Sequence, residues 1–438
     1  MTSSSASRLD GSWRRLLSGS GVVLAFKLFG ALGGFLFSLW VARAHGDAAM
    51  GRAELFILWV TVGATLLRGG WEGAVVKVFG AWTSSGERHR VREGFQKWTR
   101  FMVAIGIGTA GFGWLVLSDV IPGGSKWLGG AMGAWVVIGW LAEALRGTGH
   151  VSTYALFQPG WWMLFAGLIM ALGCQDATLA LGISAVLMAG MAFLGVSWWF
   201  RRRFTSQDLE SNLTVAGQSS FRPMARLAIP IWLGSVLHLV LSWADTAMLS
   251  AWLTEVDVAH YRAAFRLAAL LTFTQFAVNA LGAPTFGALH AAGEKDTLRK
   301  AVHRIGWMNT AVAVPGFLLL LLVGPWALSL WGPAFARDEA ITALMLLAGA
   351  QALNALSGPV MYLLNMTGEE RSGLIILGIS AVTQIVAGRV WVPEYGLVGA
   401  AASAALGMAA WNLIGVAWVR RQHGFWMVSL WNGWWRRG

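Results

Sequence analysis

The feature that most constrains the fold of this chain is a series of long apolar stretches that recurs almost from end to end. Windows of about 20 apolar residues, the length of helix that crosses a bilayer, occur about twelve times. In hydrocarbon, the backbone polar groups of each window must be satisfied within the segment itself, which favours helices. The sequence therefore predicts an all-α polytopic membrane protein. We place its spans at residues 19–44, 53–81, 101–120, 128–147, 151–173, 178–200, 227–253, 261–289, 305–330, 341–365, 373–392 and 397–419.

Composition supports this class of protein. Of the 438 residues, 56% are hydrophobic and 12% are charged, whereas a soluble domain carries about 25% charged residues. The 55 glycines and 27 tryptophans are typical of close-packed membrane helices and of aromatic belts at membrane interfaces. The single cysteine, Cys174, excludes an internal disulfide, and no Cys/His cluster has the spacing of a zinc site. We therefore expect no metal and no cofactor.

The net charge of +12 does not indicate a nucleic-acid partner, because the basic residues lie in short loops between apolar spans. Most of them fall in alternate loops, such as RHRVREGFQKWTR after the second span and EKDTLRKAVHR after the eighth. Basic loops mark the cytoplasmic side of a membrane protein, so both termini are expected in the cytoplasm. The basic N-terminus lacks a small-residue cleavage site, and we predict no removable signal peptide.

The longest internal hydrophilic segment, RRRFTSQDLESNLTVAGQSSFRP, follows the sixth span and divides the chain. We predict an N-terminal lobe of six helices at residues 1–200, a cytoplasmic linker at 201–222 and a C-terminal lobe of six helices at 223–421. The tail at 422–438 is rich in tryptophan and arginine. Such a tail is predicted to lie flat in the cytoplasmic interface, and a short frayed tail is the alternative.

A short internal repeat relates the two lobes. DAAMGRAELF begins at Asp47 and DVAHYRAAFR begins at Asp257, each where the first two spans of its lobe meet. Six spans return the chain to its starting side, so the lobes would be parallel repeats about an axis along the membrane normal. Two such lobes around a midplane site are the architecture of an alternating-access transporter. The matching residues are Asp47 with Asp257, Ala49 with Ala259, Arg52 with Arg262 and Ala53 with Ala263.

Several motifs resemble those of one family of membrane proteins. WVARAHGDAAMGRAELFILWV, from Trp40, resembles the first-loop motif of the MATE-like (MOP) exporters, in the branch of polysaccharide and O-antigen (Wzx-type) flippases. DTAMLSAW, HYRAAFRLAALL and LLAGAQALNALSGPVMYLLNMTGEER are also similar to that branch. Spans three to six resemble the family in hydropathy only. The family's turn after span ten and its Pro-x-Tyr-Gly-x-x-Gly-Ala-Ala motif are matched by Asn365, Thr367, Gly368, Pro393, Tyr395, Gly396, Gly399 and Ala400.

The resemblance implies a fold of two six-helix lobes that form a V around a central cavity. It also implies export of an oligosaccharide, carried on undecaprenyl diphosphate, across the bacterial inner membrane, as in O-antigen and lipopolysaccharide biosynthesis. A lipid-linked oligosaccharide and the membrane are then the expected partners, together with polysaccharide assembly proteins. A protein of this kind is a secondary transporter, and no catalytic residues are expected.

A diphosphate-linked sugar must be shielded from hydrocarbon, because desolvating its anion and hydroxyls is costly. Cations within the spans are therefore candidate ligands of the diphosphate. We predict Lys27, Arg68 and Arg266 in this role, with Lys77 recruiting the headgroup at the cytoplasmic entrance. Arginine suits a diphosphate because its planar fork binds oxygens in pairs, whereas lysine acts as a point charge. For Lys27, snorkelling to the cytoplasmic interface is the alternative.

Three further charged residues, Glu72, Asp245 and Arg262, are predicted to be charge partners of these cations during gating. The acidic ones each have a structural alternative. Arg68 and Glu72 are four apart on one helix face and could simply neutralise each other. Asp245 could pair with Arg262 or Arg266 as a bridge between the first two helices of the C-terminal lobe.

Polar residues that project from apolar spans suggest a hydrated cavity. The candidates are Gln275, Asn279, Gln351 and Asn354. Hydrogen bonding between helices explains any one of them equally well, so the residue type alone does not separate a cavity lining from a structural contact.

Two other functions fit this sequence less well. A multidrug exporter of the same superfamily would bind organic cations in an acidic, aromatic cavity, whereas basic residues outnumber acidic ones within these spans. A membrane-embedded polysaccharide polymerase or glycosyltransferase would need a sizeable outer loop with catalytic carboxylates, and the outer loops here are short. No G-x-x-x-x-G-K-S/T motif is present, so ATP is not expected to drive transport from within this chain.

Overall fold

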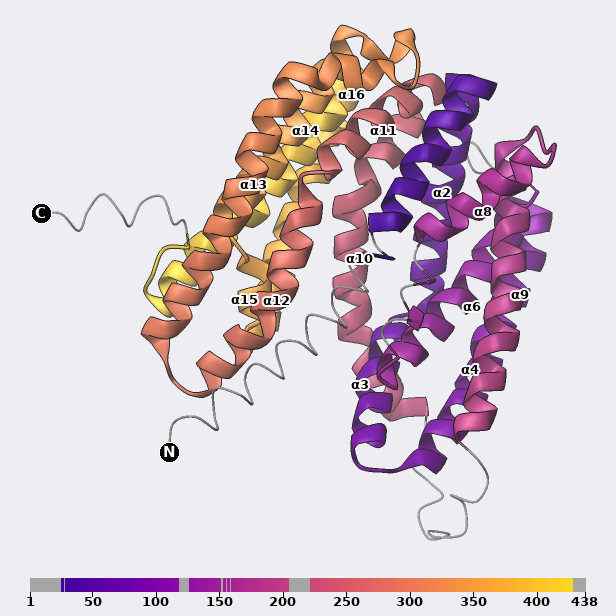
Figure 1. The fold of residues 1–438 in the computed structure, drawn as a ribbon, viewed down its shortest axis with the longest axis vertical. Helices are drawn as coiled ribbons and strands as arrows, with labels where there is room; N and C mark the ends of the chain where they lie inside the picture. Colours follow the sequence, from indigo (N-terminus) through magenta and orange to yellow (C-terminus); the bar gives the residue numbers. More distant parts are fainter. Residues whose placement is uncertain are drawn as a thin grey trace, which may run out of the picture. The chain divides into compact units, whose positions relative to one another are not determined.

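The computed structural model of the chain describes residues 25–26, 28–117, 126–150, 153–154, 156–157, 159–204 and 221–427. These described residues form helices and connecting turns without any strand, which confirms the predicted all-α class. A helix over Leu28–His45 comes first, and the labelled elements follow along the chain (Figure 1). They are α2 (Asp47–Arg68), α3 (Trp71–Ser84), α4 (Arg88–Phe112), η1 (Gly113–Leu117), α6 (Leu128–Gly147), α8 (Pro159–Ala171), α9 (Ala177–Arg203), α10 (Phe221–Trp252), α11 (Glu255–Ala269), α12 (Thr272–Ala291), α13 (Lys295–Ser329), η3 (Pro333–Ala336), α14 (Asp338–Ser357), α15 (Val360–Met366) and α16 (Glu370–His423).

Among the described residues, eight helices are long and apolar enough to cross a membrane. This finding confirms a multi-pass membrane protein. The predicted span at 128–147 coincides with α6. The predicted spans at 373–392 and 397–419 both lie in α16, which departs from helical geometry at Gly396. The φ angle of 54° at Gly396 is one that residues with a side chain rarely adopt, so the glycine marks the boundary between these two spans.

Two predicted spans are each divided into two helices by glycine. The span at 53–81 is interrupted at Gly69 and Gly70, whose φ angles are 56° and 77°. The span at 341–365 is interrupted at Gly358, which has a φ angle of 77° and is followed by a proline. A positive φ ends a right-handed helix, and proline cannot donate to the helical ladder.

Two further predicted spans differ from the observed helices. The span at 261–289 is divided between α11 and α12, and no glycine or proline at that junction explains the break. The span at 151–173 contains α8, which is 13 residues long. A helix of that length covers about 20 Å at 1.5 Å per residue, which is less than the hydrocarbon core of about 30 Å.

Packing divides the chain into two compact units. Unit 1 consists of Met1–Phe37 and Phe56–Val236, and unit 2 consists of Ser38–Leu55 and Leu237–Gly438. The N-terminal part of α2 therefore belongs to unit 2, with the C-terminal half of the chain. The two lobes drawn from the sequence stay a prediction, as does the interfacial tail, most of which lies outside the described residues.

Unit 1 is closely packed where glycines of α4 and η1 face glycines of α6. A Cβ atom added at Gly133 would lie 2.1 Å from the carbonyl oxygen of Gly106. A Cβ atom added at Gly113 would lie 2.2 Å from the Cα atom of Gly129. Small residues allow such close approach of helix backbones in membranes, where dispersion contacts replace the hydrophobic drive for packing.

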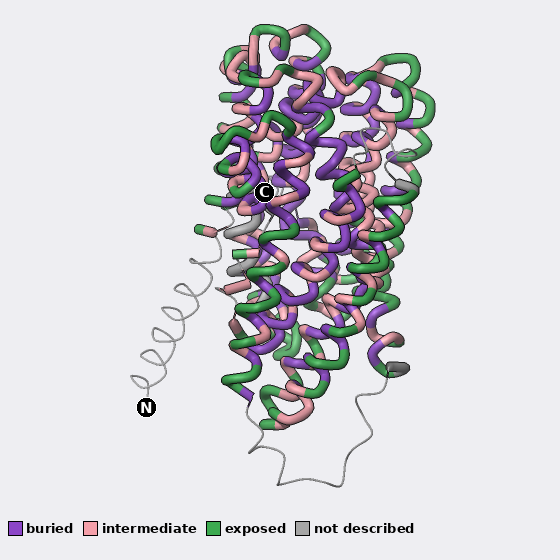
Figure 2. The backbone as a smooth tube through the Cα atoms, turned by 90° about the vertical axis from the view of Figure 1, so that its right-hand side faces the viewer, coloured by how far each residue is buried: buried purple, intermediate pink, exposed green. Residues whose placement is uncertain are grey.

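In unit 2, α13 packs against α14, and α14 packs along α16 (Figure 1). An apolar cluster joins α12, α13 and α15 and includes Phe286, Val302 and Leu363, which are fully buried. Exposed positions continue along the helices (Figure 2), and many of them are large apolar residues such as Leu322, which is 81% exposed. Apolar side chains exposed over whole helices are what a lipid environment permits and water does not.

Candidate functional site

A cluster of charged residues in unit 2 lies where the N-terminal part of α2 meets α11. Gly51 permits this approach, because a Cβ atom at that position would lie 1.8 Å from the carbonyl oxygen of Glu255. The guanidinium of Arg52 donates to the carboxylate of Glu255 at 2.9 Å. A carboxylate oxygen of Asp47, in the first turn of α2, lies 3.4 Å from Nε2 of His260. These contacts hold the two helices in register and thereby align the side chains one turn further along.

Glu54 is a buried carboxylate that pairs with two arginines. Its side chain is 2% exposed. Nε of Arg262 donates to Oε2 at 3.1 Å, and Nε and Nη2 of Arg266 donate to Oε1 at 3.0 Å and 2.5 Å. The two arginines are four residues apart on α11 and so project from one helix face. Two guanidinium groups share this one carboxylate, so the three residues Glu54, Arg262 and Arg266 together carry one net positive charge.

Arg262 is held from two sides by aromatic rings. Its guanidinium carbon lies 4.2 Å from the ring centre of Trp243 and 4.5 Å from that of Phe265, a geometry in which the ring faces attract the cation. Its Nη1 atom is buried and has no hydrogen-bond partner among the described residues. An unused N–H on a desolvated guanidinium can donate to an anionic ligand without first breaking a hydrogen bond within the protein.

Asp245 is fully buried but does not serve as the partner of these arginines. The Tyr261 hydroxyl donates to Asp245 Oδ2 at 2.6 Å, and the backbone N–H of Thr246 donates to Oδ1 at 2.5 Å. Within the part of the chain that the structure describes, Asp245 forms no ion pair. The structure thus pairs Glu54 with Arg262 and Arg266, where the sequence left a bridge from Asp245 as one alternative.

The N-terminal end of α11 is fixed by Asp257, in a reciprocal cap with Thr254. The Thr254 side chain accepts from the Asp257 N–H, and Asp257 accepts from the Thr254 N–H at 3.1 Å. Arg337 donates to the same carboxylate at 2.6 Å. Burial by itself would raise the pKa of Asp257, but the hydrogen bonds from Thr254 and Arg337 outweigh it and hold the pKa below its ordinary value.

The corresponding charges of unit 1 are paired one to one. Arg68, the last residue of α2, forms an ion pair with Glu72 on α3. Its Nη1 donates to the carbonyl oxygen of Trp135 at 3.1 Å, and its Nη2 donates to the Thr65 hydroxyl at 3.1 Å. The guanidinium also lies against Gly139, where a Cβ atom would be 2.7 Å from Nη1. Arg68 is thus enclosed by partners from α2, α3 and α6, which favours its structural role.

The two predicted lysines are placed differently. Lys77 is exposed on α3, and it forms no ion pair with any described residue. Lys27 lies outside the described residues, so its predicted contact with the diphosphate stays a prediction.

The four predicted polar residues hydrogen-bond to other helices of unit 2. Asn354 donates to Gln275 at 2.9 Å, and Gln275 donates weakly to the carbonyl oxygen of Gln351 at 3.4 Å. Asn309 donates to Asn279 at 2.9 Å. These bonds link α12 with α13 and α14 and favour the structural alternative for Gln275, Asn279 and Asn354. The side-chain oxygen of Gln351 is buried without a partner among the described residues.

Glu54 is the important residue that sequence reasoning missed. It lies at the beginning of the predicted span 53–81 and only two residues after Arg52, the position matched in the internal repeat. An ionisable residue within a span is a candidate functional residue by default, and that rule alone would have singled it out. No group of three or more metal-ligating side chains occurs in the described part of the chain. Glu54, Arg262 and Arg266 form an ionic cluster, which we call the Glu54 cluster.

Comparison with known sequences finds one matching family model and two similar proteins named as probable flippases. The sequence model of the MatE family matches residues 230–390. A "Probable flippase AglR" from Haloferax volcanii is 23% identical over 306 residues, which cover 67% of this chain and 60% of that protein. A "Probable low-salt glycan biosynthesis flippase Agl15" from the same organism is 22% identical over 401 residues, which cover 87% of this chain and 79% of that protein. The match thus spans less than two thirds of the first relative's length.

Solved structures share the fold at low sequence identity. A multidrug resistance MATE family transporter of the MOP superfamily, in an inward-facing conformation, has a TM-score of 0.74 at 15% identity, covering 92% of this chain and 98% of that chain. A MOP superfamily transporter from Pyrococcus furiosus, described by a reverse polarity of its binding pocket that suggests a different function, has a TM-score of 0.65 at 16% identity. It covers 92% of this chain and 94% of its own. At such identities the likeness concerns the fold alone.

Proposed function

We propose that this chain is a MATE-like transporter of the flippase branch and not an enzyme, and that it moves an undecaprenyl-diphosphate-linked oligosaccharide from the cytoplasmic to the periplasmic leaflet. Transport would proceed by alternating access, in the bacterial inner membrane, with both termini in the cytoplasm and with polysaccharide assembly proteins as partners. Biosynthesis of O-antigen and lipopolysaccharide is the process in which we place it. The names of the two archaeal relatives, a probable flippase and a probable glycan biosynthesis flippase, support this substrate class.

The observation that carries the proposal is that two arginines pair with the single carboxylate of Glu54. Arg262 and Arg266 share this single carboxylate, and neither arginine is more than 14% exposed. Ionised groups at a helix centre in hydrocarbon cost about 2.5–3.5 kcal/mol each on insertion scales. An anionic ligand offsets that cost, and the unpaired Nη1 of Arg262 provides a donor for it. A transporter of organic cations would require the opposite sign.

We assign the predicted cations accordingly. Arg266, together with Arg262, binds the diphosphate, while Glu54 holds the pair in place when no substrate is bound. Lys77, which is exposed on α3, recruits the headgroup. Arg68 is enclosed by its own partners and is assigned a structural role. The function predicted for Lys27 is retained as a prediction.

The test is reconstitution of the full chain into liposomes that contain a fluorescent undecaprenyl-diphosphate oligosaccharide in one leaflet. Chemical quenching of the label in the other leaflet measures translocation. Wild-type protein is expected to translocate the lipid, and Arg266→Gln is expected to reduce the rate because a charge-assisted contact with phosphate is lost. Glu54 keeps Arg262 as its partner in this variant, so the fold should persist.

Two outcomes would contradict the proposal. If wild-type protein leaves the lipid in place but exports a cationic dye from the same liposomes, the protein is a drug exporter. If wild-type protein and Arg266→Gln translocate the lipid at equal rates, the substrate class stands and the cationic site is assigned wrongly. Arg68→Gln serves as the matched control for removing one buried guanidinium.

A further inference from the structure

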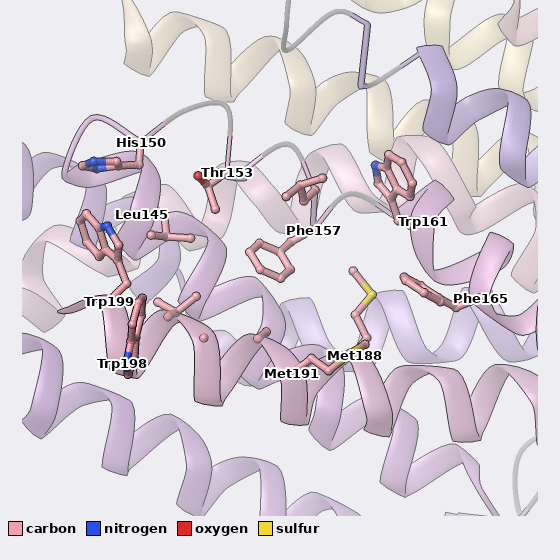
Figure 3. Close-up of a pocket in the computed structure, with 14 residues that line it drawn as sticks. Leu145, His150, Thr153, Phe157, Trp161, Phe165, Met188, Met191, Trp198 and Trp199 are labelled. Atoms are coloured by element: carbon pink, nitrogen blue, oxygen red, sulfur yellow. The ribbon is translucent and has the colours of Figure 1, made fainter. Parts of the chain in front are cut away.

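Unit 1 contains a cavity of about 500 Å³ that has no place in the proposed transport of charge. The cavity is bounded by the end of α6, by the described residues between α6 and α8, and by α8 and α9 (Figure 3). Its volume falls within the range of small-molecule binding sites, about 300–1,000 Å³. The cavity belongs to unit 1 alone and is separate from the Glu54 cluster.

The wall of this cavity is almost entirely apolar. Phe157, Trp161 and Phe165 face Met188 and Met191 across it (Figure 3). Methionine side chains are unbranched and polarisable, so they adapt to ligands of irregular shape. Met191 is 57% exposed and Phe165 is 39% exposed. The apolar wall of the cavity is therefore accessible to a ligand. In a membrane-spanning helix such as α9, this surface meets the apolar part of a lipid.

One end of the cavity is bordered by basic residues. The His150 ring lies 4.3 Å from the ring of Trp199, and the Arg202 guanidinium lies 4.2 Å from the ring centre of Trp198. Burial lowers the pKa of His150, and the nearby charge of Arg203 lowers it further, whereas a hydrogen bond to the Thr148 backbone acts in the opposite direction. The imidazole is therefore neutral at pH 7, and the positive charge at this end comes from the arginines.

The apolar and basic ends follow the direction of α9. Phe165 and Met188 lie at one end of the cavity and His150 and Trp199 at the other (Figure 3). Basic residues 201–203 end α9 and lie in the loop that the charge distribution assigns to the cytoplasm. A ligand that fits must therefore have an apolar chain within the membrane and an anionic group at the cytoplasmic interface.

We propose that this cavity binds the polyprenyl chain of a phosphorylated lipid carrier, with the carrier phosphate at the arginine end of α9. The inference rests on the proposed function, which supplies a polyprenyl-linked anion as substrate. It adds a second, separate site for that polyprenyl-linked anion, in a different unit from the arginines to which we assign the diphosphate during transport. A chain with a methyl branch on every isoprene unit is irregular, and methionine and aromatic side chains accommodate it better than a rigid aliphatic wall would.

Glycines of α9 allow the cavity to be filled without disturbing the helix. Gly195 lines the cavity, and a Cβ atom there meets no atom within 4 Å. Gly190 lies on the same helix, is equally exposed, and its Cβ atom also meets nothing within 4 Å, but it does not line the cavity. Gly195→Phe therefore occupies the cavity with an aromatic ring, and Gly190→Phe is the matched control for adding the same ring elsewhere on α9.

The experiment uses the full chain in nanodiscs and, as the probe, undecaprenyl phosphate with a photoreactive diazirine on its chain. After irradiation, peptide mass spectrometry locates the labelled residues, and competition with unlabelled undecaprenyl phosphate gives the affinity. Labelling is expected at residues 156–199 in wild-type protein and in Gly190→Phe. Gly195→Phe is expected to bind about tenfold more weakly, because it displaces about two methylene equivalents of apolar contact.

Three results would overturn the inference. The first is labelling of wild-type protein elsewhere in the chain, which is informative even if a variant fails to fold. The second is equal affinity of wild-type protein and Gly195→Phe. The third is equal competition by phosphatidylglycerol, which would identify the cavity as a site for ordinary membrane lipid.

Glycan translocation, measured separately, distinguishes failure of this inference from failure of the proposed function. Cavity labelling without glycan translocation in wild-type protein leaves the lipid site standing and refutes the flippase. Glycan translocation together with labelling outside the cavity supports the flippase and refutes the lipid site.

Discussion

Arg68, which is buried, and Arg266, which is partly buried, both bond to a glutamate in a membrane protein, yet their surroundings differ in a decisive way. In unit 1, Arg68 has its own carboxylate, Glu72, and also donates to a carbonyl and a hydroxyl. In unit 2, Arg266 shares Glu54 with Arg262. The first arrangement is close to neutral, whereas the second has two cations for one anion.

The comparison shows why a buried charge is not by itself a site. A guanidinium whose donors are used and whose charge is balanced has little left to offer a ligand, and its removal is felt as a loss of stability. A cluster with an excess cation and an unused donor, the Nη1 of Arg262, keeps both charge and hydrogen-bonding capacity for a ligand. Residue type does not separate the two cases, but the count of partners does.

Removing each glutamate should give the largest difference between the units. Glu54→Gln removes the carboxylate that pairs with both Arg262 and Arg266, and breaking a buried pair in this way costs about 3–5 kcal/mol. Glu72→Gln leaves Arg68 with Trp135 and Thr65 as acceptors, so we expect a loss of about 1–3 kcal/mol. Thermal unfolding of the two variants in the same detergent measures the difference. Equal destabilisation would show that the charge count does not matter.

Removing each arginine should separate transport from stability. We expect Arg266→Gln to lower the rate of glycan-lipid translocation by about tenfold or more, since a charge-assisted bond to phosphate is worth about 1.5–3 kcal/mol. Arg68→Gln should lower the unfolding temperature while the folded fraction still translocates at the wild-type rate. The measurement is the initial rate per folded molecule in liposomes. Loss of transport in Arg68→Gln to the same extent would return that residue to the substrate-binding set.

The close approach at Gly51 should make this position far less tolerant of a side chain than Gly108, an open glycine of unit 1. Gly51→Ala places a methyl group against the Glu255 carbonyl and must move α2 away from α11, at a cost of about 1–3 kcal/mol. Gly108→Ala on α4 meets nothing within 4 Å and should change stability by about 1 kcal/mol or less. Chemical denaturation of both variants checks the difference. Wild-type stability in Gly51→Ala would mean that the contact between α2 and α11 is not tightly packed.

Acid should destabilise the N-terminal end of α11 by a smaller free energy than the substitutions above. The pKa of Asp257 is held below its ordinary value, so its bonds to Thr254 and Arg337 stabilise the folded state above the unfolded pKa of about 3.9. That stabilisation is lost as the pH falls through the lower, folded pKa. We expect the loss of stability below about pH 4 to be shallower in Asp257→Asn than in wild-type protein. An identical acid profile for the two proteins would exclude Asp257 as its source.

Much of the fold could be predicted because a bilayer imposes one rule on every span. An apolar window such as 128–147 has only one available structure, and α6 has these bounds. Interruptions are harder to predict. The positive φ angles of Gly69 and Gly70 break a span that hydropathy alone joins, since glycine is also common in continuous membrane helices. The junction between α11 and α12 has no local signal at all, so packing rather than sequence must place it.

The site was predictable in its residue types but not in its pairs. Arg262 and Arg266 were singled out by their position in a span, whereas the partner sought for them was Asp245, which is near in the sequence. The actual partner, Glu54, is 208 residues from Arg262. A single sequence carries no information that links two positions so far apart in the chain. Asp245 instead has a neutral donor, the Tyr261 hydroxyl, which charge pairing does not anticipate.

The ratio of two arginines to one glutamate also has a consequence for energetics across the membrane. A net charge that moves within the bilayer responds to the membrane potential by about 2.3 kcal/mol per charge for each 100 mV. In the transport cycle that we propose, Glu54, Arg262 and Arg266 together carry one net positive charge before the diphosphate binds, and a diphosphate with a negative charge on each phosphate would reverse that sign. A voltage that favours movement of the empty cluster in one direction therefore favours movement of the loaded cluster in the opposite direction, so the field acts on both halves of a transport cycle.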